Sequence, residues 1–472
     1  MALVDDLRAL LGDQRVKWEP LELRIYGRDA GIGQGMPVAV VLPETTAEVA
    51  ECVLIAREWD VPIVARGAGT GLAGGAMPTE PALVIALTRM DRLHNVDAEG
   101  LTAWVGPGMI NLELSEKVAG LGLHFAPDPS SQAACTIGGN VGTNAGGPHC
   151  LADGTTVAHI LGLEMVTVDG DVLTLGGAAP DPLGLDLRAV VVGSEGTLGI
   201  VTRVLVKLTP DAPAVQTMLI AFDTIEDAAA TVSGIIAEGI VPAALEIMDQ
   251  PMVRAVENFV KADLPVHAAA VLLAEVTGHP SAAEAEARLV ASTATANGAT
   301  HVRVAADNAE RALLWKARKS AFGAVAQAAP DYYLHDTVVP RTRLVDVMSK
   351  IYEIGARYNL HMLNVFHAGD GNLHPLVAFD ARDEGVLADV TDAAREMVLV
   401  SLEAGGSLSG EHGIGLEKRD FMGQVYGPVD LDAQARLRQA FDPQGRLNPD
   451  KILPAGSRCY DYGVTLDRGE AL

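Results

Sequence analysis

The pattern of apolar and polar positions divides the chain into two parts of different texture. From about residue 38 to Pro210, short apolar runs alternate with glycine-rich loops, and helical periodicity occurs at Thr46–Trp59 and Leu112–Gly120. After Pro210 the glycine-rich loops stop, and apolar runs alternate regularly with amphipathic segments. This alternation predicts a separate αβ domain, linked to the first part by Pro210–Pro213.

The apolar runs predict individual elements in each part. In the first part, strands are expected at Pro37–Leu42, Val61–Ala65, Ala82–Ala86, Ala103–Val105, Ile160–Thr167 and Ile200–Leu208. In the second part, the expected strands are Ala214–Phe222, Ala243–Met248, Ala268–Val276, His301–Ala305, Met362–Phe366 and Pro375–Phe379. The expected helices there are Thr224–Glu238, Pro251–Phe259, Ser281–Asn297 and Asn308–Ala328, with a last helix at Leu431–Phe441.

Composition and charge exclude several classes of protein. At 472 residues the chain is too long for one core, which indicates two or three domains. The net charge of −26 argues against binding to nucleic acid or to anionic membrane surfaces. No apolar stretch is long enough to span a membrane, and the amphipathic start, Met1–Gln14, lacks the features of a signal peptide. We therefore expect a cytoplasmic protein with reduced thiols.

The four cysteines do not suggest a cluster-binding protein. Cys52, Cys135, Cys150 and Cys459 are far apart in the sequence and form no C-x-x-C pair. Their spacing matches no iron–sulfur pattern. If the chain carries out redox chemistry, its electrons must leave to an external acceptor.

Two histidines flank a short turn in the second part of the chain. His367 and His374 stand on either side of Gly369–Asn372, whose residues favour a tight reversal of the chain. Such a reversal can bring both imidazoles to one point. With Glu411, they would form a site of two histidines and one carboxylate with an open position, as a catalytic divalent metal requires. Three polar residues on a loop-rich surface are the alternative interpretation.

A glycine-rich loop in the first part resembles a dinucleotide motif without its usual context. Gly69–Gly74 fits G-x-G-x-x-G and follows a predicted strand. A nicotinamide-binding fold needs a helix to begin there, but Pro78 and Pro81 prevent one. The backbone N–H groups of the loop can still converge on a pyrophosphate, and Arg66 at the start of the loop adds positive charge.

Two further runs of small residues lie in the same part of the chain. Pro127–Ser131 precedes Thr136–Gly147, and Gly193–Thr202 lies between two apolar runs. Each run alone is equally well explained as a cluster of turns. Three such loops in one domain, none of them expected to open a helix, favour a large nucleotide cofactor bound by loops.

These loops resemble the flavin-binding domain of the vanillyl-alcohol-oxidase family, which has a PCMH-type FAD-binding fold. The later motifs resemble the FAD-linked oxidase branch of that family, and the match runs from about residue 38 to 454. This branch contains D-lactate dehydrogenases, D-2-hydroxyglutarate dehydrogenase and the flavin-binding chain of glycolate oxidase. The motifs most similar to that glycolate oxidase chain are Ala65–Leu72, Ala126–Gln132, Asp331–Tyr333, Val365–Asn372 and Gly410–Gly415.

The resemblance implies an α+β fold with two domains. The implied parts are a PCMH-type FAD-binding domain at 1–210, with its core at about 38–210, and an αβ cap domain at 211–415. The cap is expected to contain an antiparallel sheet built from two ferredoxin-like halves. A C-terminal segment at 416–472 is expected to return to the FAD-binding domain.

The resemblance also implies that the cofactor is FAD. Some relatives tether the flavin through a histidine where this chain has Thr70, so we expect non-covalent FAD, and His149 is expected to be an ordinary loop histidine. Asn448 corresponds to an asparagine near the flavin, although a helix cap or a turn explains it as well. The implied FAD-binding residues are Arg66, Gly67, Ala68, Gly69, Thr70, Gly71, Pro127, Asp128, Ser130, Thr136, Gly138, Gly139, Asn140, Asn144, Gly147, Gly196, Ile200 and Asn448.

The implied reaction is the oxidation of a small D-2-hydroxy acid, glycolate or D-lactate, to the 2-oxo acid, with hydride transfer to flavin N5. By resemblance, Zn²⁺ or Mn²⁺ is bound by His367, His374 and Glu411, and His412 is the base. An imidazole with a pKa of about 6.5 suits proton abstraction near neutral pH. A structural metal with a fourth ligand from His361 or Asp370 is the alternative.

Arg318 corresponds to the residue with which the family binds the substrate carboxylate. A guanidinium suits this role because it can donate two parallel hydrogen bonds. The alternative for Arg318 is a solvated helix face that it would share with Lys316 and Lys319. Leu334 and Phe322 stand where the 2-hydroxyglutarate branch has a lysine and a threonine, which favours a monocarboxylate substrate.

Two other functions stay open at this point. One is a dehydrogenase of the D-2-hydroxyglutarate type. The other is a flavin subunit of a larger glycolate oxidase electron-transfer complex, weakly active alone and held at the membrane periphery by a partner. The oligomeric state, including a homodimer, is also open.

Overall fold

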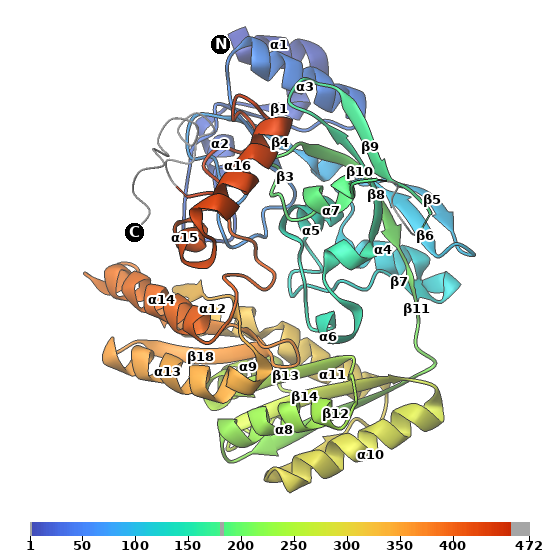
Figure 1. Ribbon diagram of the computed structural model, residues 1–472, viewed down its shortest axis with the longest axis vertical. Helices are drawn as coiled ribbons and strands as arrows, with labels where there is room; N and C mark the ends of the chain where they lie inside the picture. Colours follow the sequence, from blue (N-terminus) through green and yellow to red (C-terminus); the bar gives the residue numbers. More distant parts are fainter. Residues whose placement is uncertain (1, 180–183, 455–472) are drawn as a thin grey trace. The chain divides into compact units, whose positions relative to one another are not determined.

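The computed structural model describes residues 2–179 and 184–454, and Cys459 lies outside these residues. The backbone divides into two compact units, which Figure 1 shows in sequence colours. Unit 1 contains the chain up to Gly146, Thr155–Asp211 and the chain from Glu411 onward. Unit 2 contains Gly147–Gly154 and Ala212–Gly410. The sequence did not predict that the short segment Gly147–Gly154 groups with unit 2, and the return to unit 1 begins at Glu411 rather than at residue 416.

The strands of unit 1 form two larger sheets and one strand pair. The four-stranded sheet has the order β1-β2-β4-β3, with parallel pairing of β2 and β3 to β4, and the five-stranded antiparallel sheet has the order β5-β6-β10-β8-β9. The bounds are β1 Val16–Lys17, β2 Ala39–Val41, β3 Ile63–Arg66, β4 Leu83–Ala86, β5 Leu93–Asp97, β6 Thr102–Val105, β7 Leu123–His124, β8 Ile160–Val166, β9 Val172–Gly176, β10 Ile200–Lys207 and β11 Thr209–Pro210.

The helices of unit 1 cover these sheets. Buried side chains of α1 and α3 pack with β2 and β4 in one core, and those of α4, α5 and α7 pack with the five-stranded sheet in another. The bounds are α1 Ala2–Leu11, α2 Pro20–Tyr26, α3 Thr46–Glu58, α4 Asn111–Val118, α5 Ile137–Thr143, α7 Leu187–Val191, α15 Met422–Val425 and α16 Pro428–Phe441.

Helix α5 corrects one expectation, because the second glycine-rich loop does open a helix. The hydroxyl of Thr136 accepts a hydrogen bond from the backbone N–H of Gly139 at 3.2 Å and so caps the helix. Ile137 and Val141, four residues apart, are buried in the core of the five-stranded sheet. Capping and burial together outweigh the low helix propensity of the glycines in this segment.

Unit 2 is built on a nine-stranded sheet in which all pairings between the described strands are antiparallel. The main path has the order β15-β12-β14-β13-β18-β19-β17, and β20 pairs with both β16 and β18. The bounds are β12 Ala214–Phe222, β13 Ala244–Asp249, β14 Ala270–Gly278, β15 Ala299–Val304, β16 Asp331–Leu334, β17 Thr337–Val338, β18 His361–His367, β19 Asn372–Leu373 and β20 Pro375–Phe379. This antiparallel sheet confirms the α+β class.

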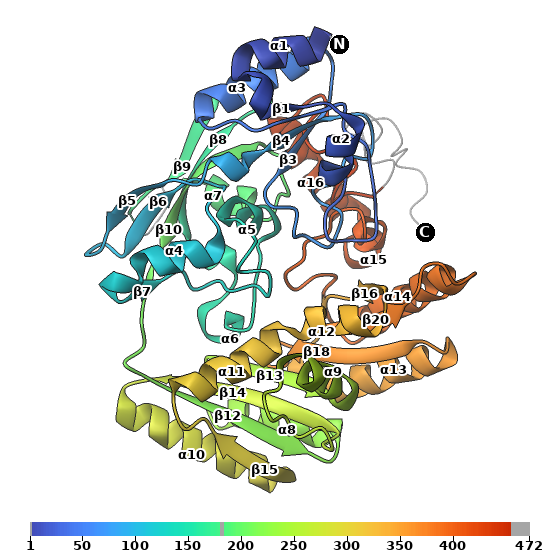
Figure 2. The same cartoon turned by 180° about the vertical axis from the view of Figure 1, so that it is seen from behind.

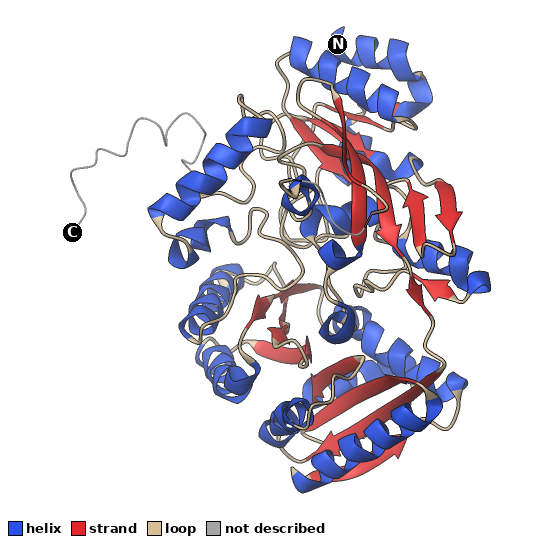
Figure 3. Cartoon of the chain, turned by 45° about the vertical axis from the view of Figure 1, so that its right-hand side comes forward, coloured by secondary structure: helices blue, strands red, loops and turns tan. Residues whose placement is uncertain are grey.

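Helices lie against both faces of this sheet (Figure 3). Helices α8, α10, α13 and α14 pack on the face that carries Leu245 and Ile247 of β13, where the main hydrophobic core of the unit lies. Helix α11 lies on the other side of β13 and β14 (Figure 2). The bounds are α6 Cys150–Asp153, α8 Ile225–Ala237, α9 Gln250–Val260, α10 Pro280–Ala296, α11 Asn308–Lys319, α12 Ala321–Ala328, α13 Leu344–Arg357 and α14 Val386–Glu403.

The predicted helix at Asn308–Ala328 is in fact two helices. Asp307 caps α11 by accepting hydrogen bonds from the N–H groups of Ala309 and Glu310, both at 2.9 Å. The helix ends at Ser320, whose N–H is shared between two preceding carbonyls and whose ψ of 2° departs from helical geometry. Among the described residues, none of the helices combines the length and the hydrophobicity that crossing a membrane requires.

Candidate active site

The hairpin between β18 and β19 brings the two predicted histidines together. His367 ends β18 and pairs with Asn372 at the start of β19, so the chain reverses over four residues. Gly371 has a φ of +75°, a conformation that a glycine adopts without steric cost. His374 follows directly after β19, and the two imidazole rings lie edge to face with their centroids 5.0 Å apart.

The segment before Glu411 is fixed to the same hairpin. Asp336, which follows β16, accepts hydrogen bonds from the hydroxyl of Ser409 at 2.6 Å and from the N–H of Gly410 at 2.9 Å. Gly410 lies against the side-chain amide of Asn372 so closely that a Cβ at this position would overlap it. Glu411 is bonded directly to Gly410, so these contacts determine where its side chain begins.

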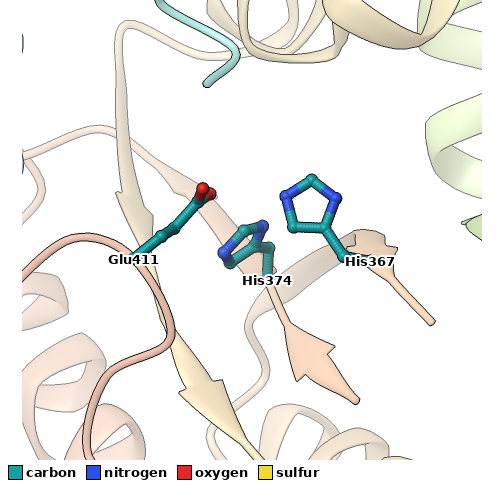
Figure 4. A group of neighbouring side chains, drawn as sticks. All are labelled: His367, His374 and Glu411. Carbon is teal, nitrogen blue, oxygen red and sulfur yellow. The ribbon is translucent and has the colours of Figure 1, made fainter. Parts of the chain in front are cut away.

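The ligand atoms of His367, His374 and Glu411 all lie within 4.8 Å of one another, and all three residues are buried. Figure 4 shows the carboxylate of Glu411 and the two rings around a common space. Two imidazole nitrogens and one carboxylate oxygen fit a divalent ion such as Zn²⁺ or Mn²⁺. Among the described residues, neither His361 nor Asp370 belongs to this group, so a bound ion would keep an open position.

Glu246 lies behind His367 in the neighbouring strand. The two residues are direct partners in the pairing of β13 with β18, and Oε1 of Glu246 is 2.7 Å from Nδ1 of His367. The other oxygen of Glu246 accepts a hydrogen bond from Nε of Arg318 at 2.7 Å. Asp336 lies near the second histidine, with Oδ1 3.5 Å from Nε2 of His374. A carboxylate therefore lies beside each of the two histidines, and the one beside His367 is within hydrogen-bond distance.

Arg318 is not part of a solvated helix face. Its side chain is 1% exposed, whereas Lys316 of the same helix is exposed, so the alternative interpretation is wrong. The guanidinium contacts Glu246 through Nε and Nη2, and Nη2 is 3.5 Å from Nδ1 of His367. Within the described residues, the buried Nη1 has no hydrogen-bond partner. An acceptor supplied by a ligand would remove the energetic cost of this unmade hydrogen bond.

His412, the predicted base, follows Glu411 in a mostly buried position. Its Nε2 is 3.7 Å from Oε1 of Glu411. The two side chains are therefore close enough to act on the same small molecule.

The predicted pyrophosphate loop of unit 1 packs on the start of α5. No helix occurs between Arg66 and Leu83, in agreement with the exclusion of a nicotinamide-binding fold. A Cβ at Gly67 would overlap the hydroxyl of Thr136, so the loop approaches the helix cap at a distance that only glycine permits. Arg66 is buried beneath the loop, where a Cβ at Gly69 would overlap its guanidinium.

A buried asparagine that was not predicted joins the second loop to α5. The side-chain amide of Asn111 donates hydrogen bonds to the carbonyl of Pro127 at 2.8 Å and to Oδ1 of Asn140 at 2.9 Å. At the other end of the helix, Asn144 has a φ of +53° and accepts a hydrogen bond from the N–H of Val157 at 2.8 Å. The predicted residues of this loop are therefore held in defined conformations.

Glu195 connects the third loop to the segment that follows His412. Its buried carboxylate accepts hydrogen bonds from the N–H groups of Ile414 at 2.7 Å and Gly415 at 3.0 Å. The N–H of Glu195 donates to the carbonyl of Gly142 at 2.8 Å. Burial raises the pKa of Glu195, which these hydrogen bonds oppose.

Asn448 and Lys451 attach the C-terminal segment to the same loops. The amide of Asn448 donates to the carbonyls of Gly75 at 2.8 Å and Glu195 at 2.6 Å, so it is neither a helix cap nor a simple turn residue. The ammonium of Lys451 donates to the carbonyl of Met77 at 2.7 Å, and burial lowers the pKa of this lysine to about 8. The three glycine-rich loops and the C-terminal segment thus meet within unit 1.

The remaining predicted cofactor residues lie in the same loops, with one exception. Gly147 groups with unit 2, as the first residue of the segment that contains His149. His149 is not free in its loop, because its ring packs at a tilt against Trp315 with centroids 5.0 Å apart and Nε2 lies 3.5 Å from the buried Glu275. The residues that lie in the loops, in α5 or at the start of β10 are Ala68, Thr70, Gly71, Asp128, Ser130, Gly138, Gly196 and Ile200.

The supporting residues Glu246, Asp336 and Asn111 were not predicted from the sequence. The sequence does contain one indication for Glu246. It is a charged residue inside the apolar run Ala243–Met248, and a charge buried in a strand needs a partner. Asp336 and Asn111 have no comparable signal, because each lies in a segment of mixed polarity.

Comparisons with known proteins agree with this architecture. The model of the FAD binding domain matches residues 37–176, and that of the C-terminal domain of FAD linked oxidases matches residues 212–452. The glycolate oxidase subunit GlcD of Escherichia coli is 44% identical, covering 91% of this chain and 86% of that protein. A D-lactate dehydrogenase of Anaerostipes hadrus is 31% identical, with 94% of each chain covered.

Solved structures show the same fold at low sequence identity. The structure of p-cresol methylhydroxylase with substrate bound superposes with a TM-score of 0.82 at 18% identity, covering 96% of both chains. The fold expected from the resemblance is thereby confirmed. With the family matches and the identity to GlcD, these findings show that the chain belongs to the FAD-linked oxidases and is an FAD-linked oxidoreductase.

Proposed function

We propose that this protein oxidises a small D-2-hydroxy acid, glycolate or D-lactate, to the corresponding 2-oxo acid. The observation that carries the proposal is the pairing of a buried three-ligand group with a buried guanidinium in direct contact with one of the ligands. A 2-hydroxy acid has a hydroxyl group and a carboxylate on adjacent carbons. It can therefore occupy the open position of a metal ion and accept hydrogen bonds from Arg318 at the same time.

The names of the relatives support this choice of substrate. The GlcD proteins of Escherichia coli and Bacillus subtilis, 44% and 40% identical, are called glycolate oxidase subunits. The relatives called D-lactate dehydrogenase are more distant, at 31% and 32% identity. Leu334 is buried at the end of β16, and a leucine there offers no charge to a second carboxylate, which favours a monocarboxylate over 2-hydroxyglutarate.

Each residue of the site has a separate role in the proposed reaction. His367, His374 and Glu411 would hold the divalent ion, which when bound polarises the substrate oxygens and lowers the pKa of the hydroxyl group. Arg318 binds the carboxylate through Nη1 and so fixes the orientation of the α-carbon. His412 accepts the hydroxyl proton at its imidazole. FAD, when bound, supplies the acceptor for the hydride.

In unit 1, the proposed cofactor site consists of the three loops that meet around α5. Gly67 packs on Thr136 and Gly139 at the start of this helix, and the backbone N–H groups of residues 67–71 would bind the anionic pyrophosphate. Thr70 offers no imidazole for a covalent link, so we propose non-covalent FAD. Release of the flavin by mild acid, without proteolysis, is the expected result.

Anaerobic reduction of the flavin tests the reaction. The purified protein, loaded with FAD and Zn²⁺ or Mn²⁺, is mixed with glycolate, D-lactate, L-lactate or D-2-hydroxyglutarate while the flavin absorbance is followed. We expect rapid bleaching by glycolate or D-lactate, loss of bleaching after chelation, and recovery when the metal is restored. Bleaching by D-2-hydroxyglutarate alone would instead select that type of dehydrogenase, and undiminished activity without metal would exclude the three-ligand site from the reaction.

A second candidate function is that of a flavin subunit in a larger glycolate oxidase complex. It is favoured by the word subunit in the names of the GlcD relatives and by the absence of a C-x-x-C motif from the sequence. A subunit of this kind would reduce its flavin rapidly with substrate but turn over slowly with a soluble dye as acceptor. Equal rates of flavin reduction and of turnover would argue for an independent enzyme.

A further inference from the structure

A row of polar residues crosses the sheet of unit 2 on the face opposite to its hydrophobic core. Thr217 of β12 pairs directly with Glu275 of β14, and Glu246 of β13 pairs directly with His367 of β18. Between these pairs, Glu246 is the diagonal neighbour of Glu275, since Glu275 pairs with Ala244. Four neighbouring strands therefore carry a continuous polar row that ends at a residue of the proposed metal site.

Helix α11 satisfies both carboxylates of this row. Arg311 donates to Glu275 from Nε at 2.9 Å and from Nη2 at 2.8 Å, and one turn later Trp315 donates to Glu275 from Nε1 at 2.6 Å. Two turns after Arg311, Arg318 donates to Glu246. The positions 311, 315 and 318 lie on one face of the helix, so one helix provides a partner for each carboxylate.

The two carboxylates nevertheless differ in what else they bind. The partners of Glu275 are Thr217, Arg311, Trp315 and, more distantly, His149. Glu246 has one oxygen on Arg318 and the other on Nδ1 of His367. It therefore joins the proposed carboxylate-binding residue to a proposed metal ligand, and it is itself fully buried.

The contact with His367 determines which ring nitrogen can bind a metal. A carboxylate paired with a guanidinium only accepts hydrogen bonds, so the imidazole must carry its proton on Nδ1. The lone pair is then on Nε2. A carboxylate at the distal nitrogen of a metal-binding histidine typically raises metal affinity by orienting the ring and fixing this tautomer.

We propose that Glu246 is a positioning residue that fixes the tautomer of His367 for metal binding and at the same time holds Arg318 in the orientation needed to bind the substrate carboxylate. The first role concerns metal binding alone, whereas the second rests on the proposed function. Because one side chain performs both roles, a change at Glu246 affects metal affinity and substrate affinity together.

The substitution Glu246→Gln tests the first role with almost no change in shape. A glutamine has one accepting oxygen and one donating NH₂ group. When its oxygen accepts from Arg318, its NH₂ group faces Nδ1 of His367, which must then accept, and the ring proton moves to Nε2. The matched control is Glu275→Gln, which removes the charge from the other carboxylate under α11 but leaves the contacts of His367 in place.

Two measurements on each variant require no substrate. Zn²⁺ affinity is measured by competition with a chromophoric chelator, and the tautomer of His367 is read from the ¹⁵N spectrum of histidine-labelled, metal-free protein, assigned with a His367→Gln sample. For Glu246→Gln we expect Zn²⁺ affinity to fall by about 10- to 100-fold and the ring proton to appear on Nε2. For Glu275→Gln we expect the affinity and the tautomer of the unchanged protein.

The outcomes separate this inference from the proposed function. Unchanged Zn²⁺ affinity in Glu246→Gln, or equal losses in both variants, would overturn the positioning role. An unchanged Nδ1–H tautomer in folded Glu246→Gln would do so as well. If Zn²⁺ affinity and tautomer change as expected but no 2-hydroxy acid reduces the flavin of the unchanged protein, the positioning role holds and the proposed substrate class is wrong.

Discussion

Replacing Arg318 by methionine should destabilise unit 2 far more than the same change at Arg311. Both arginines are on α11 and both pair with a buried glutamate. Arg318 is 1% exposed, and its removal leaves the carboxylate of Glu246 buried without a cation. Arg311 is 37% exposed, so water can partly replace its charge.

The expected magnitudes follow from this difference in burial. Removing one partner of a buried ion pair costs about 3–5 kcal/mol, because the remaining charge is unpaired and desolvated. Arg311→Met should cost about 1–3 kcal/mol, since Glu275 keeps the hydrogen bonds from Thr217 and Trp315. Adding Glu246→Gln to Arg318→Met should recover most of the loss, because the unpaired charge is then gone.

The assay needs a signal from unit 2 alone. Trp315 is the one tryptophan of the sequence between residues 212 and 410, so ¹⁹F NMR of protein labelled with 5-fluorotryptophan reports on this unit when the Trp315 resonance is followed during urea unfolding. Trp315→Phe identifies the resonance. Equal losses for Arg318→Met and Arg311→Met, or no recovery in the double variant, would refute the assignment of Arg318 as the buried half of an ion pair.

Three further predictions concern unit 1 and the segment around Glu411. Burial lowers the pKa of Lys451 from 10.5 to about 8, so between these values the unfolded chain keeps a proton that the folded chain has lost. The free energy of unfolding should therefore contain a contribution that rises by about 3 kcal/mol from pH 8 to pH 10.5, and Lys451→Met should lack it in urea unfolding. Gly410→Ala places a methyl group against Asn372 and should cost about 1–3 kcal/mol in urea unfolding and weaken Zn²⁺ binding by displacing Glu411. His412→Asn should retain FAD but slow anaerobic flavin reduction by about 10²- to 10⁴-fold in stopped-flow measurements.

Each of these predictions has a control or a contradicting result. If the free energy of unfolding depends on pH in the same way in Lys451→Met and in the unchanged protein, the folded lysine keeps its proton to higher pH than expected. Gly423→Ala is the matched control for Gly410→Ala, since a Cβ at Gly423 meets no atom within 4 Å, and equal effects of the two changes would contradict the argument from close packing. Undiminished flavin reduction in His412→Asn would remove His412 from the proposed reaction.

Most of the strands could be predicted from the sequence because they are buried and bounded by turn residues. Ala214–Phe222 and Pro375–Phe379 have the predicted bounds. Helix α5 could not be predicted, because its stability comes from a cap at Thr136 and from contacts with strands that are distant in sequence. The long helices α13 and α14 were not among the predicted elements, although both contribute buried residues to the main core of unit 2.

In the candidate site, too, some contacts could be predicted from the sequence and others could not. The proximity of His367 and His374 could be predicted, because a short turn with its own residue preferences joins them. The contact between Glu246 and His367 could not, since the two residues are 121 positions apart and meet only through the register of β13 on β18. The contact between Asp336 and Gly410 likewise joins residues that are 74 positions apart.

The return of the C-terminal segment to unit 1 has a consequence for biosynthesis. The outer edge of β3 is paired by Arg446–Asn448, where the N–H of Ile63 donates to the carbonyl of Arg446 at 2.8 Å and the N–H of Asn448 donates to the carbonyl of Ile63 at 2.7 Å. On the ribosome, all of unit 2 emerges before these residues do. Unit 2 can therefore fold while the edge of β3 is still unpaired, and an unpaired edge strand is prone to association with other chains. Until translation has passed Asn448, the nascent chain therefore carries an edge strand in unit 1 that its own C-terminal segment has not yet covered.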